Sequence, residues 1–130
     1  MPLHCTIDHS KRFVHVVTEG VVVLDEILKY YDSLVTGDAM PYRKLFDATD
    51  GDLILSDDDI MTLGAWVSAY AAMDPRGSIA IVAVSDETRD LMRRYMNLGG
   101  AKRPVKLFMS VEAARKWLDA EPEAQPSGLG

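Results

Sequence analysis

The stretch SIAIVAVS, Ser78 to Ser85, decides the fold class of this 130-residue chain. Between its two serines lie six apolar residues in a row, without the polar alternation of a strand that faces water on one side. A short apolar run of this kind is typical of an inner strand of a parallel sheet, which helices cover on both faces. We therefore expect Ile79 to Val84 to lie inside a sheet, between helical segments.

Helical and extended patterns alternate on both sides of this strand. Leu24, Ile27 and Tyr31 recur at helical intervals, whereas residues 13–17 alternate as in a strand. The glycines Gly20 and Gly37 are expected to end the segments that precede them. The sequence predicts strands over residues 3–10, 12–20, 42–48, 78–85 and 104–109, and helices over residues 24–37, 56–73, 87–98 and 111–120.

This order of elements, ββαβαβαβα, predicts an α/β sandwich that begins with a β-hairpin. We expect a mixed, mainly parallel sheet of about five strands, together with four helices. No internal repeat or linker divides the chain, so residues 1–119 are expected to form a single domain. Residues 120–130 have the composition of a flexible C-terminal tail.

The composition excludes several classes of function. A net charge of −6 disfavours nucleic acid, because an acidic chain repels phosphates. No segment approaches the roughly 20 apolar residues of a membrane-spanning helix, and the N-terminus lacks the apolar run of a signal peptide. Cys5 is the one cysteine, which excludes an internal disulfide and fits a reducing compartment. These features indicate a cytoplasmic protein without a membrane span.

Four segments carry a resemblance to a known family: EGVVVLDEIL, LFDATDGD with the later SDDDI, IAIVAVSDE, and VKLFMSVEAARKWL. The chain resembles the STAS domain over residues 3–119, and especially the SpoIIAA-like group of bacterial anti-sigma-factor antagonists. The resemblance implies the fold of that family and a non-catalytic, regulatory or protein-interaction role that needs no cofactor. It also implies that a serine at the start of the second helix accepts phosphate.

The segment Ser56-Asp57-Asp58 stands at the position of that phosphorylated motif. Ser56 occupies the place of the family's aspartate, and Asp57 and Asp58 occupy the places of its serines. Neighbouring carboxylates would repel a phosphate on Ser56, so we expect the phosphoserine switch to be absent. Ser56 is instead expected to be a helix N-cap, followed by acidic residues that the helix dipole favours.

The aspartates near this cap are not expected to bind a metal. Asp47, Asp50 and Asp52 lack the alternating spacing of a calcium-binding loop, and Asp50-Gly51 is a turn signal. The segment HCTIDH near the N-terminus places its possible zinc ligands on opposite faces of a strand. Because no nucleophile or acid–base constellation is evident, we do not expect an enzyme.

Basic residues gather near the end of the third predicted helix, in MRRYMNLGGAKR. Cations at a helix C-terminus are compatible with the helix dipole, which is one interpretation. The other is a patch for an anion or an acidic partner. The residues of this patch are Arg93, Arg94, Lys102 and Arg103.

Residues 60–73, IMTLGAWVSAYAAM, carry no charge. One face of such a helix can cover the sheet, and a second apolar face would remain in water unless something else covered it. We expect this second face to bind a second copy of the chain, as a homodimer, or another protein. Burial in the core of the monomer is the alternative. The residues of the expected interaction surface are Met61, Ala65, Trp66, Ala69 and Met73.

A second class of function is open on the same evidence. An apolar small molecule or a lipid would be held in a pocket between the second and third predicted helices. Trp66, Tyr70 and Tyr95 are the aromatic residues expected near that pocket.

Overall fold

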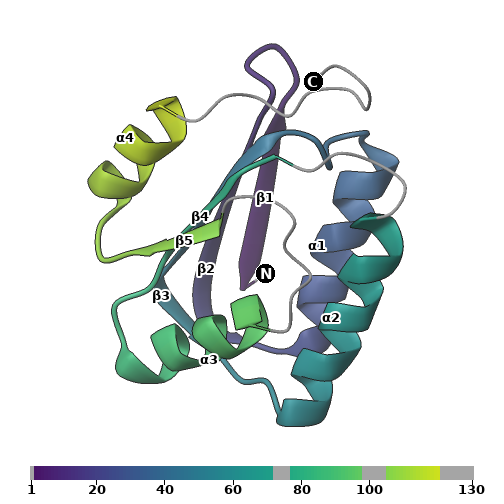
Figure 1. The fold of residues 1–130 in the computed structure, drawn as a ribbon, viewed down its shortest axis with the longest axis vertical. Helices are drawn as coiled ribbons and strands as arrows, with labels where there is room; N and C mark the ends of the chain where they lie inside the picture. Colours follow the sequence, from purple (N-terminus) through teal and green to yellow (C-terminus); the bar gives the residue numbers. More distant parts are fainter. Residues whose placement is uncertain (1, 72–76, 98–104, 121–130) are drawn as a thin grey trace.

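The computed structural model describes residues 2–71, 77–97 and 105–120, without the side chains of residues 67, 70 and 71. The described elements follow the predicted ββαβαβαβα order and form an α/β sandwich (Figure 1). Met73, Lys102, Arg103, the Tyr70 side chain and residues 121–130 lie outside the described part. The elements are β1 (Leu3–Asp8), β2 (Phe13–Val22), α1 (Leu24–Thr36), β3 (Arg43–Leu53), α2 (Asp57–Ala71), β4 (Ile79–Val82), α3 (Asp86–Asn97), β5 (Val105–Phe108) and α4 (Val111–Ala120).

The five strands form one mixed sheet in the order β1-β2-β3-β4-β5. β1 pairs antiparallel with β2, and the other neighbouring strands pair parallel. β4 therefore lies inside the sheet, between β3 and β5, and all four of its residues are buried. This confirms the prediction made from its unbroken apolar run.

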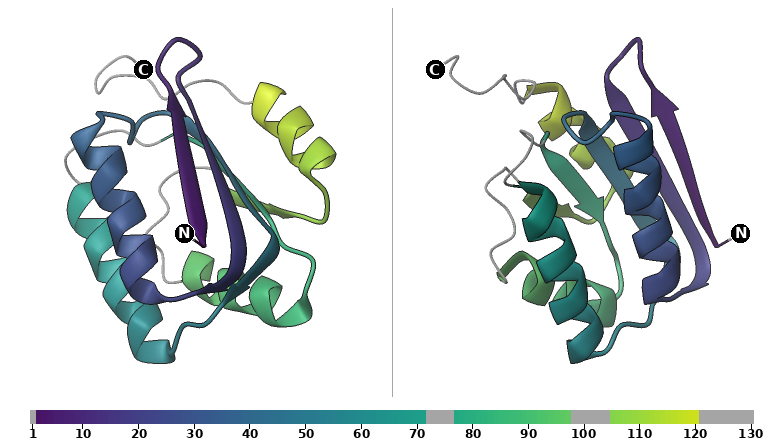
Figure 2. Two further views of the ribbon diagram at one scale, coloured as in Figure 1. Left: turned by 180° about the vertical axis from the view of Figure 1, so that it is seen from behind. Right: turned by 90° about the vertical axis from the view of Figure 1, so that its right-hand side faces the viewer.

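Helices cover the two faces of the sheet unequally (Figures 1 and 2). Ile79 and Ile81 of β4 belong to the large core beneath α1, α2 and α3. Ala80 and Val82, which point the other way, belong to a smaller core beneath α4. Because successive strand residues face opposite sides, the apolar run serves both cores.

β2 and β3 are longer than predicted. Gly20 was expected to end a strand and Asp50-Gly51 to form a turn, and both expectations are wrong. The parallel ladder continues through these residues, pairing Glu19 with Asp50 and Gly20 with Gly51. A Cβ atom on Gly51 would collide with the buried Thr18 side chain. Gly51 is thus required for the close approach of two strands and not for a turn.

Candidate functional site

The start of α2 is closed by reciprocal hydrogen bonds between Ser56 and Asp59. The Asp59 amide donates to Ser56 Oγ at 3.1 Å, and the Ser56 amide donates to Asp59 Oδ2 at 3.0 Å. This is the geometry of a capping box, with aspartate in the place usually held by glutamate or glutamine. Two backbone donors at the helix start thereby gain acceptors, so the hydroxyl of Ser56 has a structural role.

The acidic start of α2 also contacts the end of α3. Arg94 Nη1 lies 2.6 Å from Asp57 Oδ1, and the guanidinium reaches Asp90 at 3.6 Å. Arg94, itself 49% exposed, is therefore engaged by two carboxylates. Arg93, also expected in an anion patch, is exposed. Two of the four expected patch residues lie outside the described part of the chain. Asp58, beside Asp57, is exposed.

Trp66 does not lie on the outer face of α2, where the sequence placed it. Its half-buried ring packs against the large core, with its centroid 5.4 Å from that of Tyr31 in α1. The residue flanks the buried stripe of α2, which includes Leu63, and a long aromatic side chain there reaches the neighbouring helix. Of the expected outer surface, the described part keeps Met61, which is 61% exposed, and the small side chains of Ala65 and Ala69, which are also exposed.

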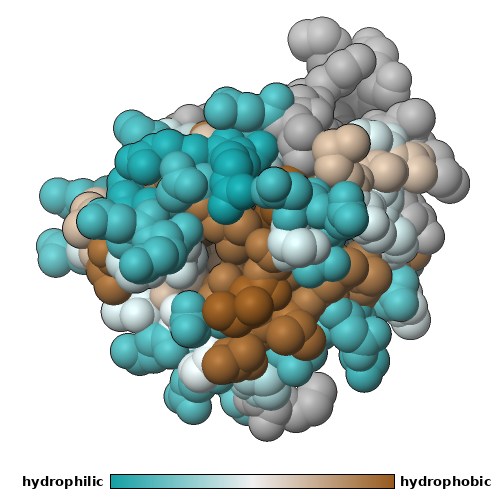
Figure 3. Space-filling view, turned by 90° about the horizontal axis from the view of Figure 1, so that it is seen from below, coloured by the Kyte–Doolittle hydropathy of each residue, from teal (hydrophilic) through white to brown (hydrophobic). Residues whose placement is uncertain are grey.

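Four large apolar side chains are exposed where β2 and β3 end and α1 and α2 begin. Ile54 donates its amide to Val22 O at 2.9 Å, which holds the two connecting segments together. Figure 3, which views the molecule from this end, shows apolar residues gathered there beside a hollow. We call this surface the apolar corner; it consists of Val21, Val23, Ile54 and Met61, which are 57%, 41%, 54% and 61% exposed.

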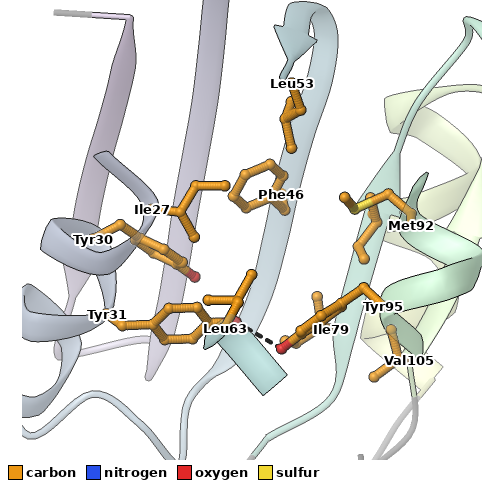
Figure 4. A pocket seen from close by; sticks show the side chains of 11 residues that line it. Ile27, Tyr30, Tyr31, Phe46, Leu53, Leu63, Ile79, Met92, Tyr95 and Val105 are labelled. Carbon is orange, nitrogen blue, oxygen red and sulfur yellow. Dashed lines mark hydrogen bonds between the residues drawn. The ribbon is translucent and has the colours of Figure 1, made fainter. Parts of the chain in front are cut away.

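A small apolar cavity lies between the sheet and helices α1, α2 and α3 (Figure 4). The hydroxyl groups of Tyr31 and Tyr95 are 3.2 Å apart and join α1 to α3 by a hydrogen bond at this cavity. Its volume is about 40 Å³. The lining residues are Ile27, Tyr30, Tyr31, Phe46, Leu53, Leu63, Ile79, Ile81, Met92, Tyr95 and Val105.

The cavity differs from the predicted pocket in both lining and size. Tyr95 lines it as expected, but Trp66 does not, because its ring packs on Tyr31 instead. A cavity that holds benzene has roughly 150 Å³. An apolar ligand would therefore fit only if the helices moved apart and the bond between Tyr31 and Tyr95 opened.

Among the described residues, those with reactive side chains form no catalytic arrangement. Burial raises the pKa of Cys5, although nearby Lys44 opposes this shift, so the thiol lacks the activation of a nucleophilic cysteine. His9 Nδ1 is 2.8 Å from the Tyr42 hydroxyl. In the described part of the chain, no three His, Cys, Asp or Glu side chains are placed to hold a metal. No helix among those described has the length and apolar character needed to cross a membrane.

The layers, the strand order and the capped helix after β3 define a STAS-type, SpoIIAA-like fold. A solved structure from Shewanella loihica PV-4, an uncharacterised DUF3478-family protein with a SpoIIAA-like fold, superposes with a TM-score of 0.57. The two sequences are 18% identical, and the match covers 89% of this chain and 93% of the other. No protein-family model matches this chain, and no curated protein matches it. The similarity establishes the fold.

Proposed function

We propose that the chain is a non-catalytic, regulatory protein-interaction module of STAS type, and that its partner binds at the apolar corner. The exposed positions of Val21, Val23, Ile54 and Met61 carry this proposal. Apolar side chains of this size gathered at one end of a domain are typical of an interaction site. The same observation moves the expected contact surface from the middle of α2 to its start.

Site-specific photo-crosslinking in cells tests this proposal. Benzoylphenylalanine at Ile54 is expected to form protein adducts, and the same residue at the exposed Lys116 in α4 is the control. The substitutions Val23→Asn and Met61→Asn should together weaken the adducts from position 54, because they remove apolar contact area. A homodimer, expected from the sequence, would give an adduct of twice the chain mass. Equal adducts from both positions, or none from position 54, would contradict the proposal.

The cavity supports a second candidate function, the binding of an apolar small molecule. Its lining is apolar apart from tyrosine hydroxyl groups, and the hydrogen bond between Tyr31 and Tyr95 can open without breaking the chain's secondary structure. Native mass spectrometry of the purified protein should then show a retained ligand. The variant Ile81→Phe, which fills the cavity, should lose it, whereas Ile54→Phe at the surface should keep it.

A further inference from the structure

We infer that the partner of the apolar corner is a basic amphipathic protein segment. This inference rests on the proposed interaction function and specifies the chemistry of the partner. The segment would place apolar side chains on the corner and Lys or Arg side chains against the carboxylates around it. The inference depends on the shape of the apolar surface and on the sign of the charge that surrounds it.

The apolar side chains of the corner come from two chain segments that lie side by side. Val21 and Val23 flank the buried Val22, so their side chains point away from the core while that of Val22 points into it. The hydrogen bond from the Ile54 amide to Val22 O brings the second segment alongside. Met61, one turn beyond the start of α2, extends the surface along that helix.

Carboxylates occur next to these apolar residues, in the strand ladder and in the first turns of α1 and α2. Asp52 is the register partner of Val21 in the β2–β3 ladder, and Asp58 lies three residues before Met61. Asp25 follows Val23 closely, in the first turn of α1. Acidic residues at helix starts are favoured by the helix dipole, which explains their presence in α1 and α2 but not that of the strand residue Asp52.

Few cations offset these carboxylates. Lys29 pairs with Asp25 at 3.1 Å, and Arg94 pairs with Asp57 at 2.6 Å. Within the described residues, Asp52 and Asp58 make no ion pair. Asp25, Asp52 and Asp58 form the rim of the apolar corner. Among the described residues this rim carries an excess of negative charge, and a partner with positive charge is complementary to it.

Other occupants of the corner fit this charge poorly. A second copy of the chain on a two-fold axis would place two copies of the same acidic surface against each other, and like charges disfavour such contact. An anionic membrane surface attracts positively charged segments. The rim is negatively charged like the membrane, so the two would repel each other. A basic helix with one apolar face, by contrast, is complementary both to the apolar corner and to the negative charge of its rim.

The test is an NMR titration of the ¹⁵N-labelled chain with a synthetic peptide of leucine and lysine. The peptide is about 18 residues long, with leucines along one helical face. The largest amide shifts are expected at Val21, Val23, Ile54 and Met61. Binding should weaken about tenfold between about 50 mM and about 300 mM NaCl, because exposed charges are screened. A peptide with glutamate in place of lysine should not bind.

Two matched double variants separate local recognition from the general acidity of the chain. Asp52→Asn with Asp58→Asn should weaken binding about fivefold or more, because both substitutions remove rim charge. Asp32→Asn with Asp119→Asn changes the net charge equally at exposed positions of α1 and α4, and should leave the affinity within about twofold. Circular dichroism checks that each variant is folded.

Several results would overturn the inference. These are equal weakening by the two double variants, shifts spread over all acidic surfaces, or equal binding of the glutamate peptide. Shifts at the corner that depend on protein concentration alone would assign it to a second copy, and binding to phosphatidylglycerol vesicles would assign it to a membrane. If the peptide fails while adducts from position 54 persist, the basic partner is wrong and the interaction module stands. If both fail, the proposed function is wrong.

Discussion

At the scale of single residues, Lys44 departs furthest from what its type predicts. Lysine is almost always exposed, yet this side chain is 1% exposed and lies in β3. Its Nζ donates to Met40 O at 2.6 Å and to Tyr42 O at 2.7 Å. The ammonium group thus holds the connection between α1 and β3, where backbone carbonyls would otherwise be buried without these donors.

Lys44→Met is expected to lower the free energy of unfolding by about 2 kcal/mol or more, because two buried carbonyls lose a charged donor. The side chain of methionine fills much of the same space, so the loss reports the hydrogen bonds more than the packing. Urea denaturation measures the change. Lys29→Met, at an exposed residue of α1, should change the stability by no more than about 0.5 kcal/mol. Equal effects of the two variants would contradict this account.

At the scale of the element, α2 combines a strong start with a flank that packs on α1. The capping box of Ser56 and Asp59 fixes where the helix begins. Trp66 then fixes the rotation of the helix, because its ring meets Tyr31 instead of solvent. Start and rotation together decide that Met61 is exposed and lies at the apolar corner.

Removing the cap tests the first of these roles. Ser56→Ala should destabilise the fold by about 1 kcal/mol, and Ser56→Asp should be nearly neutral because aspartate also caps helices. Ser68→Ala, at an exposed position inside the same helix, should be neutral or slightly stabilising, since alanine favours helices. Thermal unfolding distinguishes the three variants. Stoichiometric phosphate on Ser56 in protein from cells would contradict the expectation that this serine serves only as a cap.

Glutamate introduced at two positions of α2 tests which face of the helix points toward the core. Trp66→Glu should destabilise by about 2 kcal/mol or more, because it removes a packed ring and places a carboxylate against the core. Met61→Glu, at an exposed position, should change the stability by no more than about 0.5 kcal/mol. Thermal unfolding and sedimentation report the fold and the mass of each variant. A folded Trp66→Glu monomer obtained from a wild-type dimer would instead restore Trp66 to an interface.

At the scale of the whole molecule, the two faces of the sheet are covered unequally. Three helices cover one face, and α4 packs mainly on β3, β4 and β5 of the other (Figure 2). His15 of β2 lies on this second face, half-buried, and its Nε2 has no hydrogen-bond partner in the described part of the chain. Burial and the nearby Arg115 guanidinium of α4 lower the pKa of His15, and Asp47 partly offsets this shift.

This lowered pKa predicts how global stability depends on pH. In the unfolded chain His15 binds a proton near its ordinary pKa of about 6.5, whereas the folded chain binds it only at lower pH. The unfolded state therefore holds more protons below this value, and stability should fall as the pH drops from about 7.5 to about 5. His15→Gln should flatten this part of the profile in urea denaturation.

Several features of the fold follow from the sequence alone, because they depend on neighbouring residues. The apolar run at Ile79 to Val84 predicted an inner strand, and the alternation of helical and extended patterns predicted the order of elements. The carboxylates after Ser56 predicted a helix start. Each of these signals lies within about ten residues, a range over which periodicity and capping act.

The tertiary structure decided what depends on residues far apart in the chain. From the sequence, Gly51 was expected in a turn. In the structure β2 lies beside β3, and Thr18 fills the space that a side chain at position 51 would need. A lysine such as Lys44 is ordinarily exposed. Here its side chain is buried because backbone carbonyls of the preceding connection accept hydrogen bonds from it. From the sequence, Trp66 was expected on the outer face of its helix. In the structure its ring packs on Tyr31 of α1. The apolar corner exists only because pairing of β2 with β3 brings Val21 and Ile54 together, since a hydrophobic pattern fixes which residues are apolar but not which neighbours cover them.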